Sequence, residues 1–287
     1  MKVGLLCSQV RLEEKLILQA MREREVVFER IDVRQLAFEV GRPSMQEYDA
    51  VLIRCVSHTQ ALSASRLLES NGVRTVNSSE VIATCGDKVM TSLALAAASV
   101  PSPRTVMAFA QDSALAAVEQ IGYPAVLKPP VGSWGRLMAK ANDREAAEAV
   151  VEHQAALNRG DDTPYYVQEY IDKPGRDIRA LVVGDQTVYA IYRSSPHWIT
   201  NTARGGAPSN LPVTPEIDQL SRAAAAAVGG EVVAVDLLER ADGPLVINEV
   251  NHTPEFHGAM EATDVDIAGR IVDYLIAVAR ECAETVH

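Results

Sequence analysis

The chain has 287 residues, which is enough for two or three compact lobes that share one site. Hydrophobic residues make up 47% and charged residues 23%, as in folded globular proteins, and the formal net charge of -11 argues against a basic face for nucleic acid. The four cysteines lack the spacing of a zinc site or a disulfide framework, so we expect reduced thiols. The apolar run after Met1 is too short for a signal peptide or a membrane span, so we expect a cytoplasmic protein with no membrane partner.

The first third of the chain alternates short apolar runs with amphipathic stretches. It predicts strands at residues 3–7, 26–33, 50–53 and 74–76, and helices at residues 12–24 and 60–70. This pattern indicates an N-terminal βαβ lobe over residues 1–86 whose strands pair in parallel. The turn after the first strand, residues 8–11, contains no glycine, so the lobe does not carry the fingerprint of a dinucleotide-binding site.

A second lobe is predicted over residues 87–172. A helix over residues 87–99 ends before Pro101 and Pro103, which break the helical pattern. The predicted elements that follow are strands at 104–107, 125–128 and 165–170, helices at 113–121 and 143–157, and a glycine-rich loop at 131–136.

A third lobe is predicted over residues 173–287, so the fold class is α/β together with α+β. It begins with strands at 178–183 and 187–193 around a Gly-Asp turn, followed by a polar loop up to Pro215 and an alanine-rich helix that ends at Gly229. Strands at 232–239 and 244–250 and a helix at about 265–280 complete it. Residues 173–204 hold five basic and two acidic side chains, a local excess of three positive charges that favours an anionic small ligand.

Three oxygen-bearing side chains fall on two neighbouring predicted strands. Glu249 and Asn251 are two residues apart and therefore point to the same face of a strand, and Asp236 can face them from the preceding strand. Hard oxygen ligands of this kind suit Mg²⁺. Alone, the pattern also fits solvated polar residues at strand ends, but Asp236 follows the apolar run 232–235, where an unpartnered carboxylate would be costly.

Two further features indicate a nucleotide site, although each alone also fits an ordinary turn or strand. The glycine-rich loop follows a strand that ends at Lys128, whose ammonium could reach a phosphate, and glycines let backbone amides approach phosphates closely. The run 166–171 is predicted to be an edge strand whose free backbone groups can bind an adenine rim.

In this order, the three features resemble the ATP-grasp superfamily over nearly the whole chain. Within it the sequence is similar to the RimK-type ligases, which glutamylate ribosomal protein, and more closely to the LysX-type ligases, which attach α-aminoadipate to the amino-group carrier protein LysW. The closer resemblance is carried by residues 85–88, 132–136, 173–179, 197–206 and 248–253, of which the run 197–206 is long and specific.

The resemblance implies an ATP-grasp fold behind the N-terminal lobe, with ATP and Mg²⁺ as cofactors. It implies phosphate and nucleotide contacts from Lys88, Lys128, Gly132, Ser133, Trp134, Gly135 and Asp177, and adenine contacts from Gln168, Glu169, Tyr170 and Ile171. It implies that Arg193 and Asn201 face the γ-phosphate and the metal, which Asp236, Glu249 and Asn251 hold. A carboxylate then becomes an acyl phosphate, which an amine attacks while Arg179 or Arg204 stabilises the oxyanion.

The same resemblance implies the two substrates and a partner. The carboxylate belongs to the C-terminal glutamate of a small acidic LysW-type carrier protein, the amine is that of an amino acid, and a homo-oligomer, dimer or tetramer, is expected. The implied substrate residues are His197, Thr202, Arg204, Gly205, Gly258 and Ala259. The pair Gly258-Ala259 matches neither the Asn-Thr of α-aminoadipate enzymes nor the Gly-Phe of glutamate enzymes, so the amino acid stays open, with α-aminoadipate slightly ahead of glutamate.

Two other functions compete with this one. The first is a RimK-like ligase that adds glutamate to a protein tail or builds a small peptide, against which the run 197–206 counts. The second is a regulatory protein that binds ATP without turnover. Loss of a metal ligand or of Lys128 would favour the second, and neither is lost.

Overall fold

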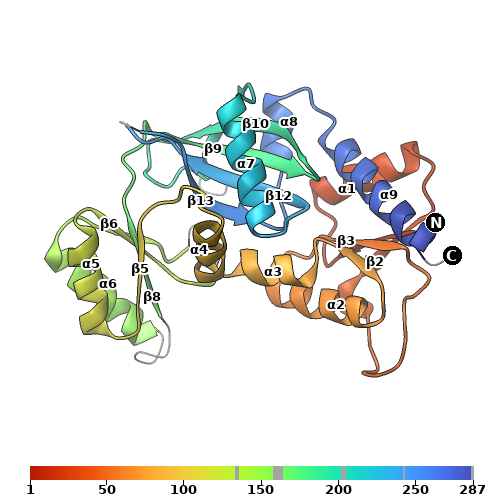
Figure 1. Ribbon diagram of the computed structural model, residues 1–287, viewed down its shortest axis with the longest axis horizontal. Helices are drawn as coiled ribbons and strands as arrows, with labels where there is room; N and C mark the ends of the chain where they lie inside the picture. Colours follow the sequence, from red (N-terminus) through yellow and green to blue (C-terminus); the bar gives the residue numbers. More distant parts are fainter. Residues whose placement is uncertain (133–135, 158–163, 202–204, 242, 286–287) are drawn as a thin grey trace.

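The computed structural model describes residues 1–132, 136–157, 164–201, 205–241 and 243–285, and these form three sheets arranged along the long axis of the molecule (Figure 1). The sheet of the first strands lies at one end, the sheet of β5 to β8 lies at the other, and the five-stranded sheet of β9 to β13 lies between them. The expected mixture of α/β and α+β structure is confirmed.

The N-terminal sheet has the strand order β2-β1-β3-β4. Its elements are β1 (Val3–Cys7), α1 (Leu12–Glu23), β2 (Phe28–Asp32), a 3-10 turn (Val33–Gln35), β3 (Ala50–Ile53), α2 (His58–Ser70), β4 (Arg74–Val76) and α3 (Ser79–Gly86). All its strands pair in parallel, as predicted. Every residue of β1 and β3 is buried, because helices cover both faces of a parallel sheet.

The sheet at the opposite end is antiparallel, with the order β5-β8-β6-β7. Its region contains α4 (Lys88–Ala97), β5 (Thr105–Ala108), α5 (Gln111–Ile121), β6 (Ala125–Lys128), β7 (Ala139–Ala141), α6 (Arg144–Leu157) and β8 (Tyr165–Glu169). The prediction that residues 166–171 form an edge strand was wrong, because β8 lies between β5 and β6. Free backbone groups can begin only where β8 ends, after Glu169.

The middle sheet has the order β11-β10-β9-β12-β13 and is antiparallel throughout. Its region contains β9 (Arg176–Val183), β10 (Gln186–Ser194), β11 (Ala207–Leu211), α7 (Pro215–Ala227), β12 (Val232–Leu238), β13 (Val246–Asn251), α8 (His257–Ala262) and α9 (Ile267–Thr285). The predicted hairpin of β9 and β10 is present. At its turn Gly184 has a φ of 60°, the left-handed region that favours glycine.

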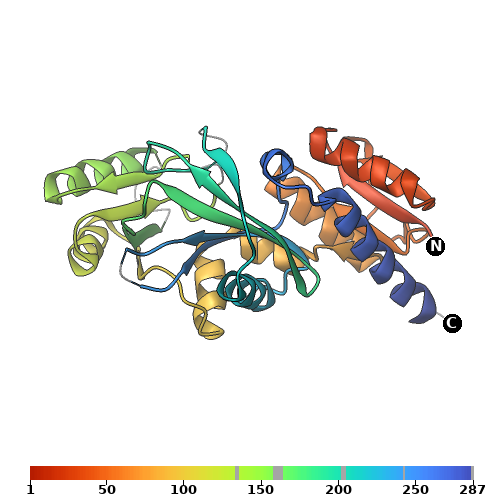
Figure 2. The ribbon, with the colours of Figure 1, turned by 90° about the horizontal axis from the view of Figure 1, so that it is seen from above.

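Helix α9 packs away from the strands that precede it in sequence. It lies along α1 beside the N-terminal sheet (Figure 2), and one apolar core joins Ile271, Leu275 and Val278 of α9 with Leu5 and Ile17 of the first strand and helix. The lobe boundaries at 86/87 and 172/173 remain predictions, and this core connects the first and third predicted lobes. None of the helices in the described ranges is long and apolar enough to cross a membrane.

Candidate active site

Two of the predicted metal ligands, Asp236 and Glu249, stand with Arg179 in one row across the middle sheet. Asp236 on β12 is directly opposite Glu249 on β13, and it is opposite Arg179 on β9 at its other side. Asn251 is two residues beyond Glu249 and therefore shares its face. The pairing of β12 with β13 shifts by one residue after Asp236, so that Asn248 stands between two paired residues. The row thus joins three neighbouring strands on one face.

Two arginines hold the carboxylates of this face in place. Arg179 donates to both oxygens of Asp236, at 2.7 and 2.8 Å, and Arg193 donates to both oxygens of Asp177 at the same two distances. Arg193 also lies 3.2 Å from Asp236 and is only 1% exposed. Burial alone would raise the pKa of Asp236, but Arg179 and Arg193 outweigh it and hold that pKa well below its usual range. The carboxylate of Asp236 therefore stays ionised.

The residues present fit a magnesium ion. Asp236, Glu249 and Asn251 offer carboxylate and amide oxygens. Asp236 has three arginine contacts, two from Arg179 and one from Arg193, and a carboxylate with about four lone-pair positions still has one for a metal. Three buried polar atoms at this face, Arg193 Nη1, Asn201 Oδ1 and Asn251 Nδ2, have no hydrogen-bond partner among the residues that the structure describes, which points to a ligand in this place. Within the described part of the chain no three His, Cys, Asp or Glu residues gather as a metal site, and the predicted set accordingly has only two carboxylates.

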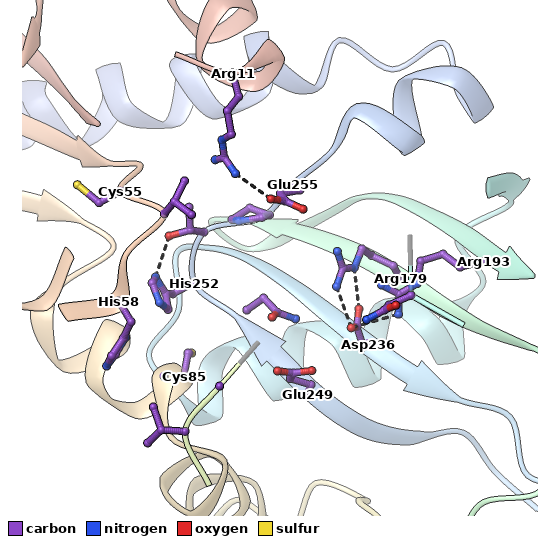
Figure 3. A pocket seen from close by; sticks show the side chains of 18 residues that line it. Arg11, Cys55, His58, Cys85, Arg179, Arg193, Asp236, Glu249, His252 and Glu255 are labelled. Atoms are coloured by element: carbon purple, nitrogen blue, oxygen red, sulfur yellow. Dashed lines mark hydrogen bonds and ion pairs between the residues drawn. The ribbon is translucent and has the colours of Figure 1, made fainter. Parts of the chain in front are cut away.

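The row separates two cavities that share Arg193, Asn201, Asp236 and Glu249 as lining residues. The first, here called the strand cavity, has about 90 Å³ and is lined by Lys128, residues 168–171, Lys173, Asp177 and Trp198 among others. The second, here called the interlobe cavity, has about 210 Å³ (Figure 3) and is lined by Arg11 and His58 from the N-terminal lobe and by Arg179 and residues 251–255 from the middle sheet region. A reaction at the row can therefore receive one reactant from each side.

Lys128 is buried at the wall of the strand cavity. Its ammonium donates to Gln168 Oε1 at 2.6 Å and to Asn248 Oδ1 at 3.0 Å. Both acceptors are neutral, so burial is the dominant effect and lowers the pKa of Lys128 to about 8. An ammonium has three donors, and the third remains available for a phosphate oxygen.

Lys88 lies at the start of α4, beside the predicted phosphate loop. Its ammonium donates to the carbonyl oxygen of Gly132 at 2.6 Å, and its backbone N–H donates to the carbonyl oxygen of Pro130. Ser133, Trp134 and Gly135 of this loop, and Thr202 and Arg204 of the later one, lie outside the described residues. Lys88 and the predicted phosphate loop thus meet at Gly132, while their contacts with a phosphate stay predictions.

The predicted adenine segment contributes to the strand cavity with all four of its residues. Gln168 holds Lys128, and Glu169 accepts a hydrogen bond from the backbone N–H of Arg104 at 2.8 Å. The rings of Tyr170 and Trp198 meet edge to face with centroids 6.4 Å apart. Tyr170 and Ile171 follow the end of β8, and their contacts with adenine stay a prediction.

Asp177 lines the strand cavity and also holds neighbouring side chains in place, and its predicted contact with the nucleotide stays a prediction. It is 5% exposed and accepts hydrogen bonds from Arg193 and from Thr200 Oγ1, the latter at 2.6 Å. The ammonium of Lys173 lies 3.7 Å from it. The predicted positive charge of residues 173–204 is accordingly balanced by carboxylates, with Arg176 paired to Glu239 at 2.8 Å.

The predicted substrate residues that the structure describes do not line either of the two cavities. His197 is exposed and its Nδ1 accepts the backbone N–H of Ile199 at 3.0 Å, which shapes the loop. Gly205 is exposed, with a φ of 84°. Gly258 and Ala259 are buried in α8, and Ala259 belongs to the core shared with the N-terminal lobe.

The lining residues of the interlobe cavity that were not among the predicted site residues include four charged or imidazole side chains, those of Arg11, His58, His252 and Glu255. The rings of His58 and His252 have centroids 5.8 Å apart (Figure 3), and burial lowers the pKa of His252 to about 4. His252 comes directly after β13, which carries Glu249 and Asn251, and Glu255 comes four residues after its end. This position in the sequence could have identified both as site residues. Arg11 and His58 carry no local signal of this kind.

Comparison with known proteins defines the class. The model of the RimK-like ATP-grasp domain matches residues 85–275, and that of the LysX preATP-grasp domain matches residues 3–84. The chain belongs to the RimK-like ATP-grasp family, and the prediction of an ATP-dependent carboxylate–amine ligase is confirmed.

Two relatives and one solved structure narrow this further. The chain is 39% identical over 277 residues to the glutamate–LysW ligase ArgX of Sulfurisphaera tokodaii, covering 96% of this chain and 98% of the relative. It is 30% identical over 280 residues to the α-aminoadipate–LysW ligase LysX of the same organism, covering 96% and 97%. A RimK domain ATP-grasp protein from Sphaerobacter thermophilus superimposes with a TM-score of 0.79 at 27% identity, covering 96% and 100%. The expected likeness to LysX-type ligases is confirmed.

Proposed function

We propose that this chain uses ATP to join the α-amino group of an acidic amino acid to the C-terminal glutamate carboxylate of a small acidic LysW-type carrier protein, in lysine or arginine biosynthesis. The observation that best supports this reaction is the row Arg179–Asp236–Glu249, which lies between two cavities with different lining residues. One cavity offers a buried lysine and an aromatic wall for a nucleotide, and the other offers charged groups from two lobes for the acceptor.

In the first step, the carrier carboxylate attacks the γ-phosphate of ATP and becomes an acyl phosphate while ADP leaves. Lys128 and Lys88 are placed to hold the phosphates, and Tyr170 and Ile171 to hold the base. Arg193 lines both cavities, and its Nη1, which has no hydrogen-bond partner in the described ranges, can donate to the transferred group. Asp236, Glu249 and Asn251 would hold Mg²⁺, which supplies charge neutralisation when bound.

In the second step, the amine forms a bond to the acyl carbon, phosphate leaves with the electrons of the broken C–O bond, and the nitrogen gives up a proton. The guanidinium of Arg179 lies at the row and lines the interlobe cavity, where it can stabilise the oxyanion of the tetrahedral intermediate. Arg204 remains the alternative proposed from the family resemblance. Both steps thus share one face of the middle sheet.

The amino acid is proposed to be glutamate or α-aminoadipate. The family resemblance of the motifs put α-aminoadipate slightly ahead. The chain is 39% identical to the glutamate enzyme and 30% identical to the α-aminoadipate enzyme of one organism, each over 96% of its length, and the higher identity favours glutamate. One methylene group changes the binding free energy by only about 1 kcal/mol in a simple pocket, so use of both is also compatible with this site.

The test is a ligation assay with a purified LysW-type carrier, Mg-ATP and either glutamate or α-aminoadipate. We expect ADP release and a carrier heavier by one amino-acid residue in the mass spectrum. Gain with one amino acid alone identifies the substrate. Repeated addition of glutamate to a protein tail would favour the RimK-like alternative, and nucleotide binding without any gain would favour the regulatory one.

Two further properties belong to this proposal. We expect a homo-oligomer, a dimer or tetramer, which light scattering during size-exclusion chromatography measures. We also expect the enzyme in the cytoplasm, where the ATP for the reaction is available.

A further inference from the structure

One ion pair at the interlobe cavity joins side chains from two lobes. Arg11, at the start of α1, donates through Nη1 to Glu255 Oε1 at 2.8 Å (Figure 3). Both side chains line the cavity, and they keep 22% and 31% of their surface exposed. Arg11 is fixed from behind, because its Nε and Nη2 donate to the buried carboxylate of Glu14 at 3.0 and 2.9 Å. Arg11 and Glu255 therefore form an ion pair that is held in place by Glu14 and is accessible from the cavity.

The lobes are already held together without this pair. Arg54, which is 2% exposed, donates to the carbonyl oxygen of Pro254 at 2.8 Å. The buried carboxylate of Glu13 lies 2.7 Å from His257 Nδ1 and accepts the backbone N–H groups of residues 256 and 257 at 3.3 Å. Glu13 and Arg54 do not line the interlobe cavity, whereas Arg11 and Glu255 do. Structural support and cavity lining are thus divided between different residues.

We propose that Arg11 and Glu255 form the receptor for the head group of the amino-acid substrate, with Glu255 accepting the α-ammonium and Arg11 donating to the α-carboxylate. The inference rests on the proposed function. An α-amino acid carries one positive and one negative group on the same carbon, and a neighbouring carboxylate and guanidinium match these two charges. Glu255 has one oxygen that Arg11 does not engage, and the Nη atoms of Arg11 keep donors beyond its three hydrogen bonds.

The α-ammonium group indicates that this receptor binds the free amino acid and not the carrier tail. The acidic carrier tail offers carboxylates, and Glu255 would repel them, whereas a free amino acid brings a cation that Glu255 attracts. The position also fits, because Glu255 is four residues beyond Asn251 and lines the same cavity as Arg179. The amine held there would face the row at which the acyl phosphate forms.

This receptor also gives the pair Gly258-Ala259 an indirect role. The two residues are buried in α8, which begins at His257, and they do not line the cavity. A larger side chain at either position would have to move α8 or the core beneath it, and Glu255 stands two residues before the helix. Substitutions there would therefore change selectivity through the placement of Glu255.

The test compares wild type with Glu255→Gln, using the carrier and Mg-ATP. Removing the charge while keeping the shape should raise the KM for the amino acid about 10- to 100-fold. The KM values for ATP and for the carrier should stay unchanged. Hydroxylamine, a small amine without a carboxylate, traps the acyl phosphate as a hydroxamate, and its yield should equal that of wild type.

Glu13→Gln is the matched control, since it removes a buried charge that joins the lobes outside the cavity. It should leave the KM for the amino acid at the wild-type value. A second variant, Arg11→Gln, is tested with glutamate against 4-aminobutyrate, or α-aminoadipate against 5-aminopentanoate, which lack only the α-carboxylate. Wild type should prefer the amino acid, and the variant should lose that preference by about 10- to 100-fold.

The possible results distinguish a failure of the proposed function from a failure of the proposed receptor alone. A wild-type enzyme that forms neither hydroxamate nor ligated carrier overturns the proposed function itself. Normal hydroxamate formation with an unchanged KM for the amino acid in Glu255→Gln overturns the receptor alone. An equal rise in Glu13→Gln, or a change in the KM for the carrier, would mean that Arg11 and Glu255 act as a lobe contact or bind the carrier tail.

Discussion

Raising the pH from 7 to 9 should weaken nucleotide binding, because Lys128 loses its proton within this range. Burial lowers the pKa of Lys128 to about 8 in the free protein, and its acceptors Gln168 and Asn248 carry no charge that would hold the proton. Phosphate oxygens prefer the charged lysine. The affinity that depends on this charge is therefore present below pH 8 and lost above it.

The magnitude follows from the titration of one group. With a pKa near 8 the protonated fraction falls from roughly nine-tenths at pH 7 to one-tenth at pH 9, so Kd should rise about tenfold. At pH 8, roughly half a proton should be taken up for each nucleotide bound, because the phosphates restore the charge on the lysine. The nucleotide adds little of its own here, since the second pKa of a phosphate ester is about 6.

Calorimetric titration with Mg-ADP, which avoids turnover, measures both quantities when it is repeated in buffers of different ionisation enthalpy. Lys128→Met is the control and should bind more weakly, with a Kd that does not change with pH and without proton uptake. A constant Kd and no uptake in wild type, together with weak binding by the variant, would show that the buried ammonium stays charged. Wild-type affinity in Lys128→Met would remove this lysine from the phosphate site.

Three other changes test the ion pairs and the proposed metal site. Glu249→Gln should cut magnesium-dependent ADP release by orders of magnitude with the same thermal unfolding curve, and near-normal turnover would contradict the metal assignment. Asp177→Asn should lower the unfolding free energy by about 3 kcal/mol, measured in urea, because Arg193 stays buried with one anion fewer, and wild-type stability would show that Asp177 is not needed to hold it. Arg54→Met leaves Glu14 buried beside Arg11 alone and should cost about 3–5 kcal/mol in the same measurement, so a loss below about 1 kcal/mol would refute that reasoning.

The part of the site that lies on regular strands could be predicted from the sequence. Glu249 and Asn251 share a face because side chains alternate along any strand, and Asp236 follows from the one strand before it. Lys128 could likewise be placed at the end of an apolar strand, but its position beside Gln168, 40 residues further along the chain, was not local information. Short-range periodicity is sufficient wherever two strands are consecutive in the chain.

The remainder depends on contacts between distant segments. Arg11 and Glu255 are 244 residues apart, and no periodic pattern in either segment indicates that they meet. The position of β8 inside its sheet depends on the order of four strands rather than on its own residues. The elements absent from the prediction, α3, β7, β11 and α8, have eight residues or fewer, which is too short for a clear periodicity against the polar loops around them.

The packing of α9 on the N-terminal lobe has a consequence for synthesis on the ribosome. Leu5, Ile17 and Met21 emerge first, but their shared core includes Ile271 and Leu275, which are made about 250 residues later. The apolar surface of the first lobe that α9 covers therefore stays exposed to solvent while the two sheets that follow in the chain are being synthesised. The first lobe therefore reaches its final packing only after α9 has been made, so a chain interrupted before Ile271 would keep this apolar surface exposed.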